Sequence, residues 1–201
     1  HMLVWNYRTP QWLFQKPDGE PLPRKQALAN LRHYIETVMR HFRGRLTAWN
    51  VVNEAISEAE GEYLRDTPAL RAIGEDYVAL AFQYAHPADP DVPLYYNDFN
   101  IEQPGKREKA LRLLRDLRAR GLRVDAVGIQ GHWLLNSPES QVIEDGIRAF
   151  VEEGWKVMIT ELDIDVLQRS NSAAILDALE SGPNPYPDRL PDHLQRALAA
   201  R

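Results

Sequence analysis

Five short apolar runs recur along the chain, and each ends in polar residues. They span 2–6, 46–53, 93–97, 125–130 and 156–160. None alternates cleanly between apolar and polar positions, which is the pattern expected of strands covered on both faces. The runs therefore predict buried strands of a parallel sheet.

Helical patterns separate these runs, and they cover 24–43, 70–86, 105–120 and 138–153. Gly44, Gly121 and Gly154 lie where a helix should end before the next strand begins. The segment Ser137-Pro138-Glu139 has the form of an N-cap followed by Pro at the first helical position. After a Pro-rich loop, one more helix is predicted near the C-terminus, with Asp192 as a candidate cap.

This alternation of strand and helix predicts an α/β fold with a parallel sheet. The chain has 201 residues, of which 44% are hydrophobic, and this is enough to form a substantial core. We treat residues 1–201 as a single catalytic domain.

Composition excludes several classes of function. The net charge is −5 and no basic stripe is interleaved with aromatic residues, so nucleic acid is not an expected partner. No cysteine is present, which rules out disulfides and thiolate metal sites. No apolar run has the length of a membrane span. Zinc and nucleotide motifs are absent from the sequence, so we expect no metal and no cofactor.

Polar residues with chemical potential follow the predicted strands. Asn6, Asn53-Glu54, Asn97-Asp98, Gln130 with His132, and Glu161 with Asp163 stand at or just beyond successive strand ends. In parallel βα architectures the carboxyl ends of the strands form one face, and ligands bind there. We therefore expect these side chains to surround one site.

Glu54 and Glu161 are the central candidates in this group. A pair of carboxyls facing a cleft is the minimum equipment for glycoside hydrolysis, one protonated and the other ionised. Asn53 is placed to bond a sugar hydroxyl, and His132 with Asp163 to hold Glu161 ionised. A lone Glu at a strand end is more often a helix-terminal acid or an ion-pair partner. Two of them with these neighbours favour catalysis.

The segments that carry these residues resemble those of glycoside hydrolase family 10, the retaining endo-β-1,4-xylanases. They are "HMLVWNYRTPQWLF", "WNVVNEAIS", "LYYNDFNIE", "VDAVGIQGHW" and "VMITELDIDV". They occur in the family's order and cover nearly the whole chain. The resemblance implies hydrolysis of xylan through a glycosyl-enzyme intermediate, with carboxyl groups about 5–5.5 Å apart.

The resemblance also implies individual roles. Glu54 matches the general acid/base and Glu161 the nucleophile. Asn53 matches the amide that binds the sugar 2-hydroxyl, and His132 with Asp163 the pair that supports the nucleophile. Further matches to residues of the sugar site or its borders are His1, Trp5, Asn97 and Gln130. Trp133 is a candidate ligand contact for another reason, because it follows His132 in the expected cleft.

The chain departs from the family pattern at several positions. Asn6 stands where the family usually has a second His, and Asn50 replaces an Asp. Asn50 keeps hydrogen-bonding capacity but carries no charge. Phe99 replaces a common Tyr on the aglycone side.

The family fold is an eight-stranded (β/α) barrel, and this chain matches its third to seventh βα units. We therefore expect a partial TIM-type barrel, incomplete at both ends, with unpaired parallel edges. Self-association or a complementary segment would cover those edges. Two alternatives stay open, a catalytically impaired xylan-binding fragment and a related retaining β-1,4-glucanase. A polymeric substrate implies a secreted or periplasmic location, because a polysaccharide cannot enter a cell.

Overall fold

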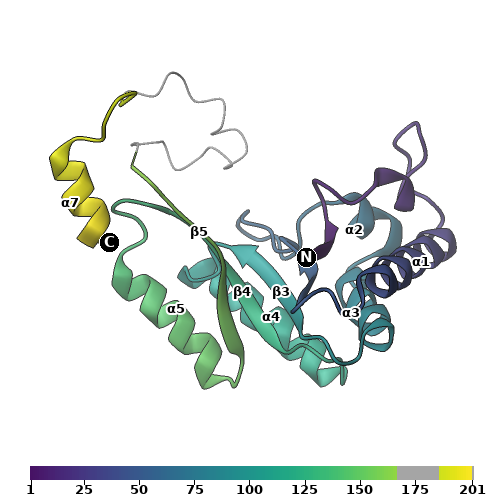
Figure 1. The fold of residues 1–201 in the computed structure, drawn as a ribbon. Helices are drawn as coiled ribbons and strands as arrows, with labels where there is room; N and C mark the ends of the chain where they lie inside the picture. The colour runs from purple at the N-terminus through teal and green to yellow at the C-terminus, as the bar shows by residue number, and fades with distance from the viewer. Residues whose placement is uncertain (167–185, 201) are drawn as a thin grey trace.

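A single parallel sheet forms the centre of the molecule in this computed structural model, which describes residues 1–166 and 186–200. Its strands are β1 (Met2–Trp5), β2 (Trp49–Asn53), β3 (Leu94–Phe99), β4 (Ala126–Leu134) and β5 (Lys156–Asp165). They pair in chain order, and every pairing is parallel (Figure 1). The predicted strands and their direction are confirmed.

Helices connect consecutive strands, one more helix in the described residues follows the last strand, and all of them lie outside the sheet (Figure 1). They are the 3₁₀ turn η1 (Gln11–Leu13) and the α-helices α1 (Arg24–Phe42), α2 (Pro68–Ile73), α3 (Tyr77–Ala88), α4 (Pro104–Ala119), α5 (Ser140–Glu152) and α7 (Asp192–Ala200). Asp192 is the first helical residue of α7, one position later than an N-cap would stand.

The predicted helix over 70–86 is wrong in one respect, because it is two helices. Thr67 caps α2 by accepting a hydrogen bond from the Leu70 amide at 3.1 Å. Gly74, with φ of +99°, then ends α2 before α3 begins. Few residues other than glycine adopt this backbone conformation, so the chain turns at Gly74 and the helical pattern is interrupted.

The predicted N-cap at Ser137 is also wrong. The Ser137-Pro138 peptide is cis, and α5 begins only at Ser140. The Leu134 amide donates to the Ser137 carbonyl at 2.8 Å, which holds this segment in a turn after β4. The three predicted helix-ending glycines are confirmed. Gly44, Gly121 and Gly154 each have positive φ directly after a helix C-cap.

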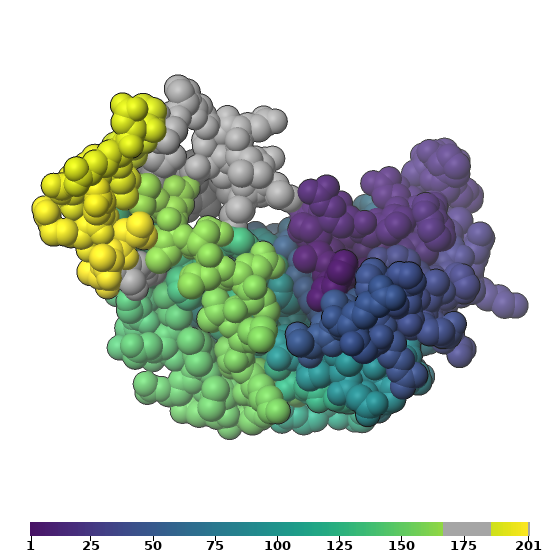
Figure 2. Space-filling model, in the orientation of Figure 1, coloured from purple at the N-terminus to yellow at the C-terminus, as the bar shows by residue number. Residues whose placement is uncertain are grey.

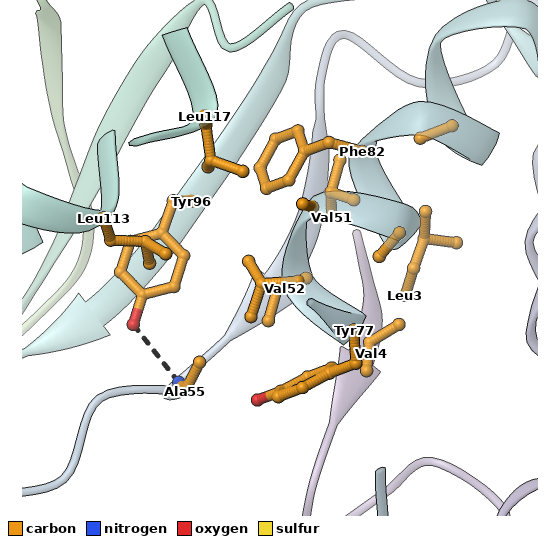
Figure 3. Packing of buried hydrophobic residues seen from close by; sticks show 14 of the residues in the cluster. Leu3, Val4, Val51, Val52, Ala55, Tyr77, Phe82, Tyr96, Leu113 and Leu117 are labelled. Carbon is orange, nitrogen blue, oxygen red and sulfur yellow. Dashed lines mark hydrogen bonds between the residues drawn. The ribbon is translucent and has the colours of Figure 1, made fainter. Parts of the chain in front are cut away.

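The core lies between the sheet and its helices. Val51 and Val52 of β2 pack near Phe82 of α3, and Leu113 and Leu117 of α4 lie close to the same layer (Figure 3). All are 4% exposed or less. Full burial of one such side chain contributes about 1.5–3 kcal/mol. Packing of the helices against the sheet fixes the positions of the strands, so the carboxyl ends of the strands are held in a defined arrangement.

The β5 end of the sheet is much less covered. Met158, Ile159 and Leu162 are 46%, 36% and 65% exposed, and β5 lies on the surface that faces the viewer in Figure 2. Within the described residues, β1 and β5 each pair with one neighbour only. The sheet is therefore open at both edges, as expected for part of a barrel.

Candidate active site

Polar side chains from four neighbouring strands meet at the carboxyl end of the sheet. Asn53 of β2 stands in register with Asn97 of β3, and Gln130 of β4 with Glu161 of β5. The four side chains are joined through direct hydrogen bonds. The structure thus brings these four side chains together, as expected from the sequence.

The Asn53 side chain is the hub of the hydrogen-bond network. Its Oδ1 accepts from the amides of Asn50 at 2.9 Å, Asn97 at 2.8 Å and Gln130 at 3.1 Å. Its Nδ2 donates to Glu54 Oε1 at 3.0 Å. Asn53, Asn97 and Gln130 are at most 4% exposed. Buried polar groups that bond to one another form a rigid arrangement, although Asn50 Oδ1 is buried here without a partner among the described residues.

Glu54 lies at the inner edge of this network and is 7% exposed. Its Oε1 also accepts from Gln130 Nε2 at 3.1 Å. Its backbone φ is +57°, a left-handed conformation that is uncommon outside glycine. The Glu54 amide donates to the Asn97 carbonyl at 2.9 Å. A strained backbone held by neighbouring contacts is a frequent feature of functional sites.

Glu161 occupies a different environment on the other side of Asn97. Its Oε1 accepts from Asn97 Nδ2 at 3.3 Å, and its Oε2 contacts His132 Nε2 at 3.0 Å. The other ring nitrogen of His132 contacts Asp163 Oδ2. The Glu161 side chain is 38% exposed. The two glutamates thus reach one amide network, Glu54 buried within it and Glu161 open to solvent.

Irregular strand registers make this density of polar groups possible. In β5, Ile159 pairs with Ile129 and Glu161 with Gln130, so Thr160 is an extra residue. Thr160 Oγ1 donates to Asn97 Oδ1, and Glu161 accepts from Asn97 Nδ2. Successive residues of a regular strand point to opposite faces, so a bulge is needed for both to reach Asn97.

β2 contains a second register shift, between Asn50 and Val52. Residues three apart on a regular strand face opposite ways, yet Asn50 bonds directly to Asn53. Asn50, the uncharged substitute for the family's Asp, therefore supports the hub as a hydrogen-bond donor. Asn50 and Thr160 were not among the predicted site residues, because regular alternation would direct them away.

A pocket adjoins Glu54 on the β1 side. Trp5, Asn6 and Gln11 line it together with Asn53 and Glu54. Trp5 is thus placed beside the predicted acid/base. Asn6, noted from the sequence only as a departure, also faces this space.

Trp133 follows His132 on β4 and is partly exposed. Its Nε1 donates to Glu102 Oε1 at 3.1 Å. Glu102 is fully buried, and burial raises the pKa of its carboxyl group. Glu102 was missed from the sequence, where an acid just before a helix gives no sign of a partner on β4.

His1 is the one predicted site residue whose ring the structure does not bring to this site. It lies at the amino end of β1, with its ring centroid 6.1 Å from those of Phe42 and Trp49. Trp5, at the carboxyl end of the strand, is four residues further on, or roughly 13 Å at 3.3 Å per residue. The Asn50 backbone amide donates to the His1 carbonyl at 2.9 Å, so His1 adjoins the network through its backbone, and the role of its ring in substrate binding stays a prediction.

The comparison with protein families decides which family this arrangement represents. Residues 1–188 match the model of glycosyl hydrolase family 10. This chain belongs to glycosyl hydrolase family 10. Its five parallel strands are therefore part of a TIM-type (β/α) barrel, as the resemblance implied.

Known proteins similar to this chain are longer. The β-1,4-xylanase of Dictyoglomus thermophilum is 42% identical over 171 residues, which are 85% of this chain and 47% of that protein. Endo-1,4-β-xylanase A of Xylanibacter ruminicola is 41% identical over 172 residues, 86% of this chain and 46% of that protein. The chain thus spans about half the length of these curated relatives.

Solved structures agree with the fold. Xylanase XynB from Paenibacillus barcinonensis, complexed with a conduramine derivative, gives a TM-score of 0.80 at 39% identity, covering 86% of this chain and 52% of that one. An endoxylanase retrieved from a sugarcane soil metagenome gives 0.88 at 32% identity, covering 100% and 59%.

In residues 1–166 and 186–200, no cluster of three His, Asp or Glu side chains is arranged to hold a metal ion. Among the helices within those same residues, none has the length and apolarity needed to cross a bilayer.

Proposed function

We propose that this chain carries the catalytic machinery of a retaining endo-β-1,4-xylanase, which cleaves internal bonds of xylan. The observation that carries the proposal is the shared amide network between two unlike carboxyl groups. Asn53 bonds Glu54, and Asn97 bonds both Asn53 and Glu161. Two carboxyls held in one rigid frame with different exposure suit the two roles of a retaining glycosidase.

In the first step, Glu54 is the general acid and Glu161 the nucleophile. A Glu161 oxygen attacks the anomeric carbon while Glu54 gives its proton to the departing glycosidic oxygen. A covalent glycosyl-enzyme results. In the second step Glu54, now ionised, takes a proton from water, which attacks the anomeric carbon and releases Glu161. Both steps invert the centre, so the overall result is retention.

The neighbours supply orientation and charge. His132 contacts Glu161 through one ring nitrogen and Asp163 through the other, and this fixes the nucleophile. Asn53, Gln130 and Asn97 offer amides for sugar hydroxyls once substrate displaces their present bonds. Trp5 and Trp133 provide apolar surface beside the carboxyls for the faces of the sugar rings.

The proposal includes a completed barrel built on residues 1–201 as one domain. Exposed Met158, Ile159 and Leu162 on β5, and the unpaired edge of β1, favour a covering segment or a second copy at these edges. Xylan is a polymer outside the cell, so we place the working enzyme in a secreted or periplasmic setting.

The test is release of reducing sugar from soluble xylan by this chain and by Glu161→Ala. Glu152→Ala, which removes an exposed glutamate of α5, is the matched control. We expect release by the wild type and by Glu152→Ala and none by Glu161→Ala. Proton NMR of the first product should detect the β-anomer, as retention requires. An α-anomer as first product would contradict the mechanism.

The same assay separates the alternatives. Binding of xylan by a folded wild type without any sugar release would identify a catalytically impaired fragment. Faster cleavage of carboxymethyl cellulose than of xylan would identify a β-1,4-glucanase.

A further inference from the structure

A buried charged network lies behind the site, on the helix-facing side of β3. Asp98 is fully buried, and its carboxylate accepts three hydrogen bonds. Lys106 Nζ donates at 2.8 Å and the Phe99 amide at 2.9 Å, both to Oδ1. The Tyr96 hydroxyl donates to Oδ2. A buried charge pair that is fully bonded is strongly directional, and removing one partner leaves the others unpaired.

This network is distinct from the amide network around Asn53. Residues 96 and 98 point to the opposite face from Asn97, because side chains alternate along a strand. The Lys106 ammonium lies between Asp98 and the Phe99 ring, 3.6 Å from the ring centroid. The side chains of Lys106 and Asp98 are 6% and 0% exposed. Within the described residues neither side chain hydrogen-bonds to Glu54 or Glu161, and the charges of Asp98 and Glu54 interact through space.

One contact nevertheless connects the buried network to Glu54. The Ala55 amide donates to the Tyr96 hydroxyl oxygen at 3.2 Å (Figure 3). The preceding amide, that of Glu54, donates to the Asn97 carbonyl at 2.9 Å. The peptides on both sides of the Glu54 Cα atom are therefore bonded to β3. These are the bonds that hold the left-handed backbone at Glu54.

The direction of the Tyr96 hydroxyl depends on Asp98. Burial raises the pKa of Tyr96 well above its usual range, so the hydroxyl keeps its proton. Because the Tyr96 hydroxyl donates its hydrogen bond to Asp98, a lone pair of the hydroxyl oxygen faces the Ala55 amide. Burial raises the pKa of the Asp98 carboxyl, and the Lys106 ammonium bonded to it opposes that rise.

We propose that Lys106, Asp98 and Tyr96 form a positioning network for the acid/base carboxyl. Through the Ala55 amide, they hold the left-handed backbone that turns the Glu54 side chain toward Asn53 and Gln130. This inference rests on the proposed function for the role of Glu54. The structural part of the inference, that the Tyr96 hydroxyl holds the Ala55 amide, does not depend on activity.

The test compares Tyr96→Phe with Ile35→Val. Tyr96→Phe keeps the ring and removes only the hydroxyl. Ile35 is fully buried in α1, away from the site, and its shortening weakens the fold without touching Glu54. Hydrogen exchange of the Ala55 amide is measured by NMR in both variants. We expect exchange roughly tenfold faster in Tyr96→Phe, the effect of losing one hydrogen bond. We expect no local change in Ile35→Val.

The kinetic readout uses two xylobiosides with different leaving groups. A phenyl leaving group needs the general acid, and a 2,4-dinitrophenyl group does not. Tyr96→Phe should lower kcat/KM for the phenyl substrate about tenfold and leave the dinitrophenyl substrate within about twofold. Ile35→Val should change neither. An equal loss on both substrates, or unchanged Ala55 exchange, would overturn the proposal. If the wild type cleaves neither substrate, the proposed function fails, and the exchange measurement alone decides the positioning role.

Discussion

Gly128 of β4 is the position where a single methyl group should disturb the site most directly. Asn97 lies opposite Gly128 in the sheet register, and its side chain crosses over the glycine. A Cβ atom added at Gly128 would lie 2.2 Å from Asn97 Oδ1 and 2.7 Å from Thr160 Cγ2. Ordinary contact begins at 3.4 Å, so the Asn97 amide must move by more than an ångström.

The free energy of unfolding should fall accordingly in Gly128→Ala. Forcing a methyl group into a packed site costs about 1–3 kcal/mol. Moving the amide also breaks its bonds to Asn53 and Glu161, each contributing about 0.5–1.5 kcal/mol. We expect a total loss of about 2–6 kcal/mol, a large part of the ~5–15 kcal/mol typical of a domain.

The assay is urea unfolding of a double-mutant cycle with Asn97→Ala. In the Asn97→Ala background the 2.2 Å contact with Asn97 Oδ1 is absent, and the remaining close contact of the added Cβ is with Thr160 Cγ2 at 2.7 Å. Gly128→Ala should then cost only about 1 kcal/mol, against at least about 2 kcal/mol in the wild type, which makes the coupling at least about 1 kcal/mol. Gly105→Ala is the control, because a Cβ there meets nothing within 4 Å. Additive losses within ~0.5 kcal/mol would refute the reasoning.

Three further predictions follow from the same structure. Glu102→Gln should flatten the pH dependence of stability. Burial raises the pKa of the Glu102 carboxyl above 4.5, so the stability that the wild type has below pH 4.5 is lost as pH rises through the folded pKa, whereas the amide of the variant keeps the Trp133 bond without titrating. Equal slopes of the unfolding free energy against pH in the two proteins would contradict this. Gly146→Ala should destabilise the protein by about 1–3 kcal/mol in thermal unfolding, although alanine forms helices better than glycine, because the added Cβ would lie 2.7 Å from the Glu102 backbone. A raised Tm would exclude the clash. Leu162→Glu should reduce any concentration-dependent self-association in analytical ultracentrifugation, because it places charge on the exposed β5 surface; unchanged association would locate the contact elsewhere.

The strands and three of the helix ends could be predicted because local rules determine them. Gly44, Gly121 and Gly154 have positive φ, a conformation that favours glycine, so each marks a helix end in the sequence as well as in the structure. The clustering of Asn53, Asn97 and Glu161 followed from topology. Parallel strands have their carboxyl ends at one edge, whatever their side chains.

The two errors in the predicted helices have separate physical causes. The 137–139 segment has a good helix-start pattern, but the hydrogen bond from the Leu134 amide to the Ser137 carbonyl keeps it in a turn. At 70–86 the apolar pattern continues through Gly74, whose positive φ ends α2 before α3 begins.

The strand bulges could not have been predicted, and the reason lies in the fold itself. A bulge reverses which face each later residue occupies, and an alternating sequence would record that reversal. The strands of a parallel sheet are apolar on both faces, so their sequences contain no alternation to interrupt. Val51 and Thr160, the extra residues of β2 and β5, are therefore hidden in apolar runs. The same burial that makes these strands easy to find conceals the irregularities that bring Asn50 and Thr160 into the site.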